Sequence, residues 1–174
     1  MLDVSVSYNR YKFLGYEYLT WLWFVIDQGQ GKIAGLEPEP VSIEIGNRIV
    51  LENKKRDAVE SITIKGDDAG LEEGMLALRK GALVAELNLL LEADDQQWQF
   101  TLKGESLHFV SFKTPPTGPV ESREDLEGAV LEKAYLCERA IDCMDKLFKQ
   151  FITLRVSGEW SKKVVPRIRK WMHS

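Results

Sequence analysis

Alternation of apolar and polar positions predicts β-strands in the first half of the chain. Residues 41–45 and 48–53 flank Gly46-Asn47, a dipeptide typical of a two-residue hairpin turn. Residues 60–65 alternate again, and residues 3–8 form a shorter candidate strand.

A second group of alternating segments follows at residues 82–92, 97–103 and 106–113. Gly104-Glu105 separates the last two segments and favours a hairpin, so we expect a three-stranded meander. The first segment is long, and alternation places five apolar side chains on one of its faces, namely Leu83, Ala85, Leu87, Leu89 and Leu91.

Helical periodicity appears first in the aromatic-rich segment from Phe13 to Asp27. Its apolar positions cover nearly the whole circumference, so this helix must be buried on several sides or face a partner chain. A shorter helix is predicted over residues 71–80, where Gly81 suits a C-terminal cap.

A long helix is predicted from Ser122 to about Leu154, with Ser122 and Asp125 placed as in a capping box. Apolar residues repeat along it with heptad spacing, which is typical of a packing seam. The seam comprises Val130, Ala134, Cys137, Ile141, Met144, Phe148 and Phe151. After Ser157-Gly158, residues 159–172 predict a basic helix that Pro166 kinks or splits.

These elements predict an α/β fold of the α+β kind. We expect a mixed, largely antiparallel sheet packed by the aromatic N-terminal helix and the long C-terminal helix. Residues 1–154 are predicted to form this domain, and residues 155–174 a basic amphipathic C-terminal tail.

Composition agrees with a packed soluble protein, since 44% of the 174 residues are hydrophobic and 29% are charged. The longest strongly apolar run, residues 18–26, is less than half of the roughly 20 residues that a membrane-spanning helix needs. The N-terminus has no pattern of a secretory signal. We therefore expect a cytoplasmic location, with Cys137 and Cys143 as reduced thiols.

Charge is distributed unevenly along the chain. Residues 155–174 contain six cations and one acid, so they carry +5, while the whole chain carries −4. The other 154 residues must therefore carry −9. This asymmetry indicates a polyanionic partner for the tail.

No residue pattern predicts an enzyme. The sequence has two histidines, His108 and His173, no metal-ligand spacing and no phosphate-binding glycine loop. The pairs Asp67-Asp68 and Asp94-Asp95 lie at strand ends and are interpreted as solvated turn carboxylates. We expect no catalytic residues, no metal and no cofactor.

Three interpretations of the basic tail stay open at this point. It contacts nucleic-acid phosphates, it lies on an anionic membrane or a protein partner, or it docks its apolar side on the domain. Trp160 and Trp171 are positioned either to stack on bases or to pack on the domain. The candidate nucleic-acid-binding residues are Lys162, Lys163, Arg167, Arg169 and Lys170 of the tail, together with Lys54, Lys55 and Arg56.

Aromatic residues concentrate in residues 8–24, either as hydrophobic core or as a dimer interface. The candidate interface residues are Tyr18, Trp21, Leu22, Trp23 and Phe24.

Several stretches resemble the C-terminal half of the recombination-associated RdgC family. Residues 13–24, which contain Leu19-Thr-Trp-Leu22, look like the family's helix opening, and Arg48 to Lys55 resembles a strand that ends in paired lysines. Residues 78–87 are similar to the next strand. A hairpin over residues 98–112 and a long helix after Arg123 follow in the family's order. The chain looks like a divergent, shortened member that matches over residues 13–150.

The resemblance implies a non-catalytic protein that binds duplex DNA with little sequence preference, forms ring-shaped dimers and restrains RecA-type strand exchange. Lys54 and Lys55 fall where the family has its paired lysines, near a dimer contact and the DNA-facing surface, and Arg56 replaces a neutral residue. The family's N-terminal half has no counterpart here, and a closed two-interface ring depends on it. The tail after residue 155 also has no counterpart.

We therefore expect a sequence-independent DNA-binding protein, a homodimer associated with the nucleoid. The alternative is a non-catalytic interaction or dimerisation module that uses the aromatic helix or the heptad seam and binds no DNA.

Overall fold

The computed structural model describes residues 11–32, 36, 41–55, 58–66 and 68–174. The candidate strand at residues 3–8 and Arg56 lie outside this part of the chain. Of Lys54 and Lys55, only the backbone is described.

The fold contains a five-stranded sheet with the strand order β2-β1-β3-β4-β5. All four strand pairings are antiparallel, so the predicted mixed sheet is antiparallel throughout. The strands are β1 (Val41–Lys55), β2 (Ala58–Lys65), β3 (Leu83–Ala93), β4 (Gln96–Lys103) and β5 (His108–Lys113). The predicted meander is confirmed in β3, β4 and β5.

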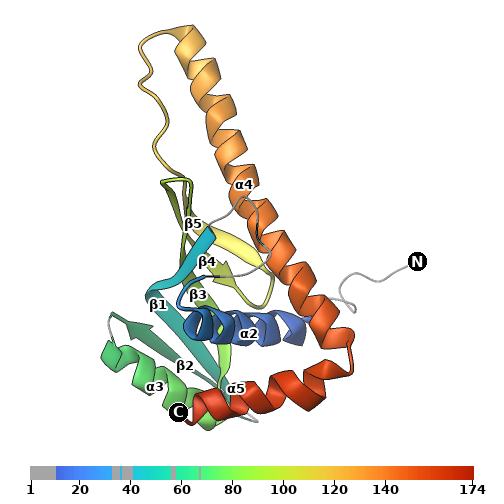
Figure 1. Cartoon of the computed structure of the whole chain (residues 1–174). Coiled ribbons are helices and arrows are strands. Elements are labelled where there is room, and N and C mark those ends of the chain that lie inside the picture. The colour runs from blue at the N-terminus through green and yellow to red at the C-terminus, as the bar shows by residue number, and fades with distance from the viewer. Residues whose placement is uncertain (1–10, 33–35, 37–40, 56–57, 67) are drawn as a thin grey trace, which may run out of the picture.

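The helices are α2 (Phe13–Gly29), α3 (Asp68–Arg79), α4 (Arg123–Val156), the π-helix η1 (Trp160–Val164) and α5 (Val165–Met172). Helices α2 and α3 cover one face of the sheet, and α4 rises past its edge so that its first half stands clear of the other elements (Figure 1). Helix α5 runs along the base beside α2 and α3. The α+β class predicted from the sequence is therefore confirmed.

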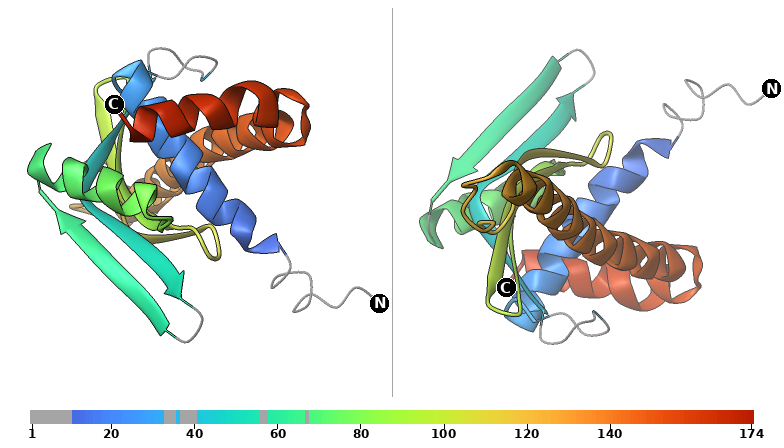
Figure 2. Two further views of the ribbon diagram at one scale, coloured as in Figure 1. Left: turned by 90° about the horizontal axis from the view of Figure 1, so that it is seen from below. Right: turned by 90° about the horizontal axis from the view of Figure 1, so that it is seen from above.

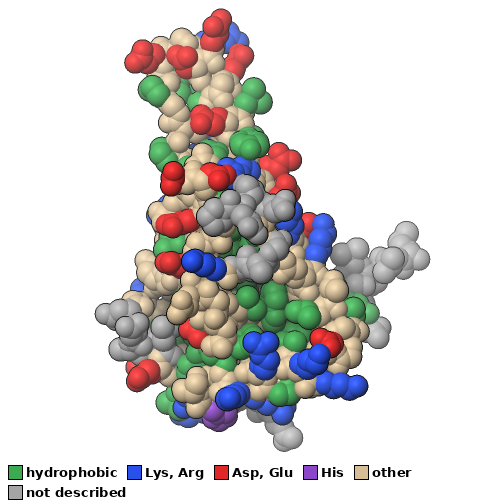
Figure 3. Space-filling model, in the orientation of Figure 1, with side chains coloured by type: hydrophobic (Ala, Val, Ile, Leu, Met, Phe, Trp, Pro, Cys, Tyr) green, Lys and Arg blue, Asp and Glu red, His purple; other side chains and the backbone are tan. Residues whose placement is uncertain are grey.

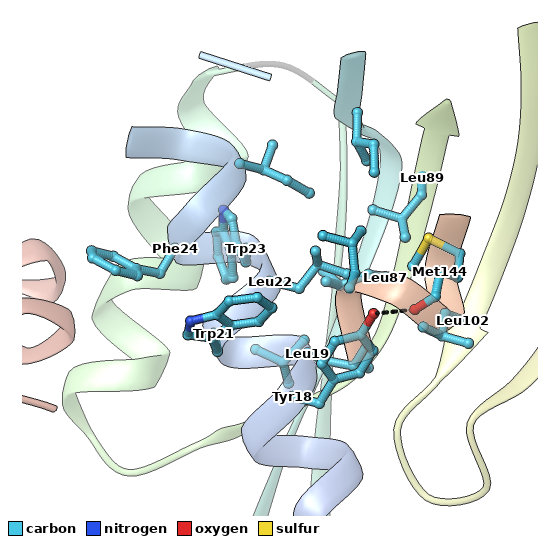
Figure 4. Close-up of a cluster of buried hydrophobic side chains, with 14 of the residues drawn as sticks. Tyr18, Leu19, Trp21, Leu22, Trp23, Phe24, Leu87, Leu89, Leu102 and Met144 are labelled. Atoms are coloured by element: carbon cyan, nitrogen blue, oxygen red, sulfur yellow. Dashed lines mark hydrogen bonds between the residues drawn. The ribbon is translucent and has the colours of Figure 1, made fainter. Parts of the chain in front are cut away.

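Helix α2 is sandwiched, which explains why its apolar residues surround it. Leu19 and Leu22 point toward the sheet, where they meet Leu87 and Leu89, whereas Phe24 lies on the opposite side of the helix (Figure 4). Tyr18 packs edge-on against Phe148 of α4, with ring centroids 5.1 Å apart. Burial on several sides is thus confirmed.

The prediction that this helix carries a dimer interface is wrong. Each of the five candidate side chains is at most 6% exposed within the single chain. Burial also raises the pKa of the Tyr18 hydroxyl, which donates to the Met144 carbonyl oxygen at 3.4 Å. The five residues are core, namely Tyr18, Trp21, Leu22, Trp23 and Phe24.

The predicted hairpin turn at Gly46-Asn47 is also wrong, because both residues lie inside β1. The register with β3 shifts between Ile45 and Ile49. A Cβ at position 46 would lie 2.1 Å from Oδ1 of Asn88, so glycine here permits a close approach between neighbouring strands.

A bulge in β3 changes which side chains face the core. Val50 pairs with Glu86 and Leu51 with Val84, so Ala85 is the extra residue. Val84 consequently joins Leu87 in the main core, whereas Leu83 is 37% exposed. The predicted face is correct from Leu87 onward and wrong before it.

The long helix begins as predicted. Ser122 Oγ accepts from the N–H of Asp125, and the Asp125 carboxylate accepts from the N–H of Ser122, which completes a capping box. The heptad seam, however, divides. Met144 and Phe151 are buried in the chain's own core, whereas Val130 and Ile141 are exposed.

Candidate nucleic-acid interface

Helix α5 is docked on the domain through its apolar side. Ile168 and Trp171 belong to the main core cluster and are 8% and 4% exposed. The Trp171 ring meets the rings of Trp23 and Phe24 edge-on, with centroids 5.5 and 5.6 Å away. Its indole N–H donates to Asp27 Oδ2 at 2.8 Å.

The start of this segment is also anchored. Arg155 at the end of α4 forms an ion pair with Glu17 of α2, with 2.5 Å between Nε and Oε2. Its guanidinium lies 5.6 Å from the centre of the Trp160 ring, which packs edge-on against Phe151. Arg155 therefore serves the packing of η1 on α4.

The opposite side of η1 and α5 carries five exposed cations, which we call the basic face. Figure 3 shows Lys and Arg side chains gathered along the base of the molecule, where these two helices run. The basic face comprises Lys162, Lys163, Arg167, Arg169 and Lys170.

Two members of the basic face have contacts within the chain. Lys163 forms an ion pair with Glu159, and the Arg167 guanidinium lies 5.7 Å from the centre of the Phe24 ring. Lys162, Arg169 and Lys170 form no ion pair with any described residue. Their charges are free to meet an external anion.

A small hollow of about 270 Å³ lies beside the basic face, between the end of α2 and α5. Arg167 and Lys170 line it together with the Gln28 amide and the Ser174 hydroxyl. Two cations one turn apart can share one phosphate group. Sequence reasoning missed Gln28 and Ser174, because no local pattern shows that the end of α2 lies beside the end of α5.

The aromatic residues of this region offer no stacking platform. Trp171 and Phe24 are 4% and 6% exposed, and Trp160 is held between Phe151 and Arg155. Of the two roles left open for the tryptophans, the structure shows packing on the domain. The same docking leaves the apolar side of α5 unavailable for insertion into a membrane.

Lys54 and Lys55 lie far from the basic face. They end β1, where they pair with Val59 and Ala58 at the start of β2. Both views of Figure 2 place this end of β1 and α5 on opposite sides of the molecule. The structure does not bring the two predicted groups of cations together, and Arg56 is not described.

The carboxylates at strand ends have structural roles where they are described. Asp94 and Asp95 form the β3–β4 turn with positive φ angles, and Asp94 accepts from Arg139 of α4 at 2.8 Å. A wider hollow of about 730 Å³ beside this turn is open to solvent. Within the described residues, no three metal-ligating side chains gather at one place.

None of the helices in the described part of the chain has an apolar stretch long enough to cross a bilayer. The chain matches no protein-family model, and it matches no curated protein at a significant level of similarity.

Proposed function

We propose that this chain binds DNA without sequence preference, and that the basic face contacts the phosphates of a duplex. One observation carries the proposal. Helix α5 docks its apolar side in the core, and together with η1 it holds five cations outward, three of them without an ion pair among the described residues. Fixed cations on an acidic protein are suited to a polyanion.

The buried tryptophans favour a duplex over a single strand. Proteins that bind single strands stack successive bases on exposed aromatic rings. Here the rings near the basic face are used in docking, so phosphate contact is what the surface offers. Phosphates are the same for every sequence, which is why we propose binding without sequence preference.

The resemblance to the RdgC family supports the same proposal, since those proteins bind duplex DNA with little sequence preference. By that resemblance we further propose a role in modulating RecA-type recombination.

The test is fluorescence anisotropy of a labelled duplex, titrated with the wild-type chain and with a double variant, Arg169→Gln/Lys170→Gln. Both residues are exposed and lack an ion pair among the described residues, so the fold is expected to persist. At low salt we expect the affinity to fall at least tenfold. A shuffled duplex of equal length is expected to bind the wild-type chain equally well.

The matched control is Lys113→Gln/Arg123→Gln, which removes two exposed cations at the end of β5 and the start of α4. Figure 1 shows that the start of α4 and α5 lie at opposite ends of the molecule. Its affinity is expected to stay within twofold of wild type. An equal loss in both variants would mean that net charge alone matters, and the proposed interface would be abandoned.

A further inference from the structure

The first half of α4 exposes large apolar side chains that nothing in the described chain covers. Figure 3 shows hydrophobic side chains on this projecting part of the molecule, next to acidic ones. A soluble protein rarely leaves such a surface without a partner. The most exposed are Leu126 at 52%, Val130 at 61%, Leu131 at 72% and Tyr135 at 58%.

Part of this surface forms a continuous line, which we call the α4 stripe. Leu126, Val130, Ala134, Cys137 and Ile141 follow one another at spacings of four, four, three and four residues. Such spacing keeps side chains on one side of a helix and suits a two-helix contact. The stripe is bordered at its lower end by an apolar groove of about 200 Å³. Groove residues besides Ile141 include Leu102, Leu107, Phe109 and Phe148.

Opposite charges border the α4 stripe. Lys133 lies on one side of it and Glu138 on the other, five residues further along. Both are exposed, and neither forms an ion pair within the described residues. In a parallel pair of helices, residues with this separation meet across the interface.

We infer that the α4 stripe binds the α4 stripe of a second copy of this chain, in a parallel, two-fold symmetric pair. Lys133 then faces Glu138 of the partner subunit, and two-fold symmetry supplies this ion pair twice. Small side chains at Ala134 and Cys137 allow the two helices to approach closely in the middle of the contact.

Charge selects the parallel arrangement. Glu138 and Asp145 are seven residues apart on the same side of the seam. In an antiparallel pair each side of the seam meets its own copy, so Glu138 would lie away from Lys133 of the partner subunit and this ion pair could not form. The inference stands independently of DNA binding, although a parallel pair also places both basic faces at the same end of the dimer.

The first test is the molar mass of the full chain by sedimentation equilibrium over a range of concentrations. We expect a rise from 19.9 kDa toward twice that value. Val130→Glu is expected to hold the chain at the monomer mass, with unchanged circular dichroism because Val130 is exposed. Tyr135→Glu is the matched control, since Tyr135 is equally exposed on another side of α4, and it is expected to dimerise like wild type. A wild-type monomer at every concentration, or a Val130→Glu dimer, would overturn the inference.

The second test fixes the direction of the helices. Lys133→Glu and Glu138→Lys each place like charges opposite one another and are expected to weaken dimerisation several-fold. The double variant restores an attractive pair and is expected to recover wild-type affinity. Failure of the double variant to recover would rule out the parallel register.

Cysteine cross-linking gives an independent readout. In the parallel register Cys137 faces Cys137 of the partner subunit, so mild oxidation is expected to produce a covalent dimer. Burial raises the pKa of the Cys143 thiol to about 11, so this second cysteine stays inert. We expect Cys137→Ser to lose the cross-link and Cys143→Ala to keep it. A cross-link that survives Cys137→Ser would contradict the parallel arrangement.

Discussion

Gly15 lies where α2 crosses the turn between β4 and β5. A Cβ added at this position would lie 1.7 Å from the Gly104 carbonyl oxygen, which is backbone and cannot swing aside. The two glycines therefore set how closely α2 can approach the sheet. The local sequence does not show why residue 15 must be a glycine. The requirement comes from a contact with a residue 89 positions further along the chain.

We expect Gly15→Ala to lower the free energy of unfolding by about 1–3 kcal/mol, since the helix must shift away from the turn. Gly29→Ala is the control in the same helix, because no atom lies within 4 Å of its added Cβ. That variant is expected to be neutral or more stable by up to about 1 kcal/mol. Urea denaturation of both variants measures the difference. Equal stability of the two variants would contradict the close contact.

Asp125 gives the capping box a pH dependence. Its contact with the Ser122 side chain, and the hydrogen bonds that its carboxylate accepts from the backbone N–H groups of Ser122 and Glu121, lower its pKa below the usual 3.8. A depressed folded pKa means that the stabilisation is fully present above 3.8 and is lost as the pH falls through the folded value.

We therefore expect the first turn of α4 to fray at acidic pH while the rest of the helix stays folded. Amide hydrogen exchange, expressed as protection factors, measures this for residues 123–126. Asp125→Ala is expected to show low protection at neutral pH as well. Protection that does not change between pH 6 and pH 2 in the wild-type chain would count against the cap.

At the scale of elements, α5 joins the core more closely than its polar composition suggests. Deleting residues 155–174 would remove Ile168 and Trp171 from the core and uncover Trp23 and Phe24. Loss of DNA binding after such a truncation would therefore report unfolding as much as lost charge. Single substitutions on the basic face separate the two effects.

Trp171→Ala is expected to cost about 3–5 kcal/mol of folding free energy, as for other large buried aromatic residues. Lys170→Ala, at the adjacent exposed position, is expected to change stability by less than about 0.5 kcal/mol. Thermal denaturation of the two variants tests how firmly α5 is docked. Similar melting temperatures would mean that α5 is held by something other than its buried side.

Most elements could be predicted because their patterns are local. The alternation in β4 and β5, the Ser122 cap and the break at Ser157-Gly158 depend on neighbouring residues alone. The hairpin predicted at Gly46-Asn47 was wrong because the glycine is required by a close contact with Asn88 on the neighbouring strand, not by a turn. The prediction of which β3 side chains face the core was wrong before Leu87, because the bulge at Ala85 depends on how β3 pairs with β1.

At the scale of the whole molecule, charge separates along its long axis. Acidic side chains cluster on the projecting end of α4, and the basic face lies at the other end (Figure 3). The excess of cations in the tail could be predicted from the sequence. Which of these cations form ion pairs within the chain could not. Arg155 is used for packing and Lys163 is paired with Glu159, which only the folded arrangement shows.

The candidate site was likewise predictable in part. Its cations could be listed from the tail, since they are contiguous. Their separation from Lys54 and Lys55 could not be predicted, because it depends on where α5 packs relative to the end of β1.

The slope of log Kobs against log salt concentration, measured for a DNA duplex, tests the proposed phosphate contacts most directly. We predict a steep negative slope for the wild-type chain. Each of Lys162→Gln, Arg169→Gln and Lys170→Gln is predicted to make the slope shallower by about 0.9, the value for one lost phosphate contact. No binding at low salt, or a slope that none of the three substitutions changes, would contradict DNA binding through the basic face.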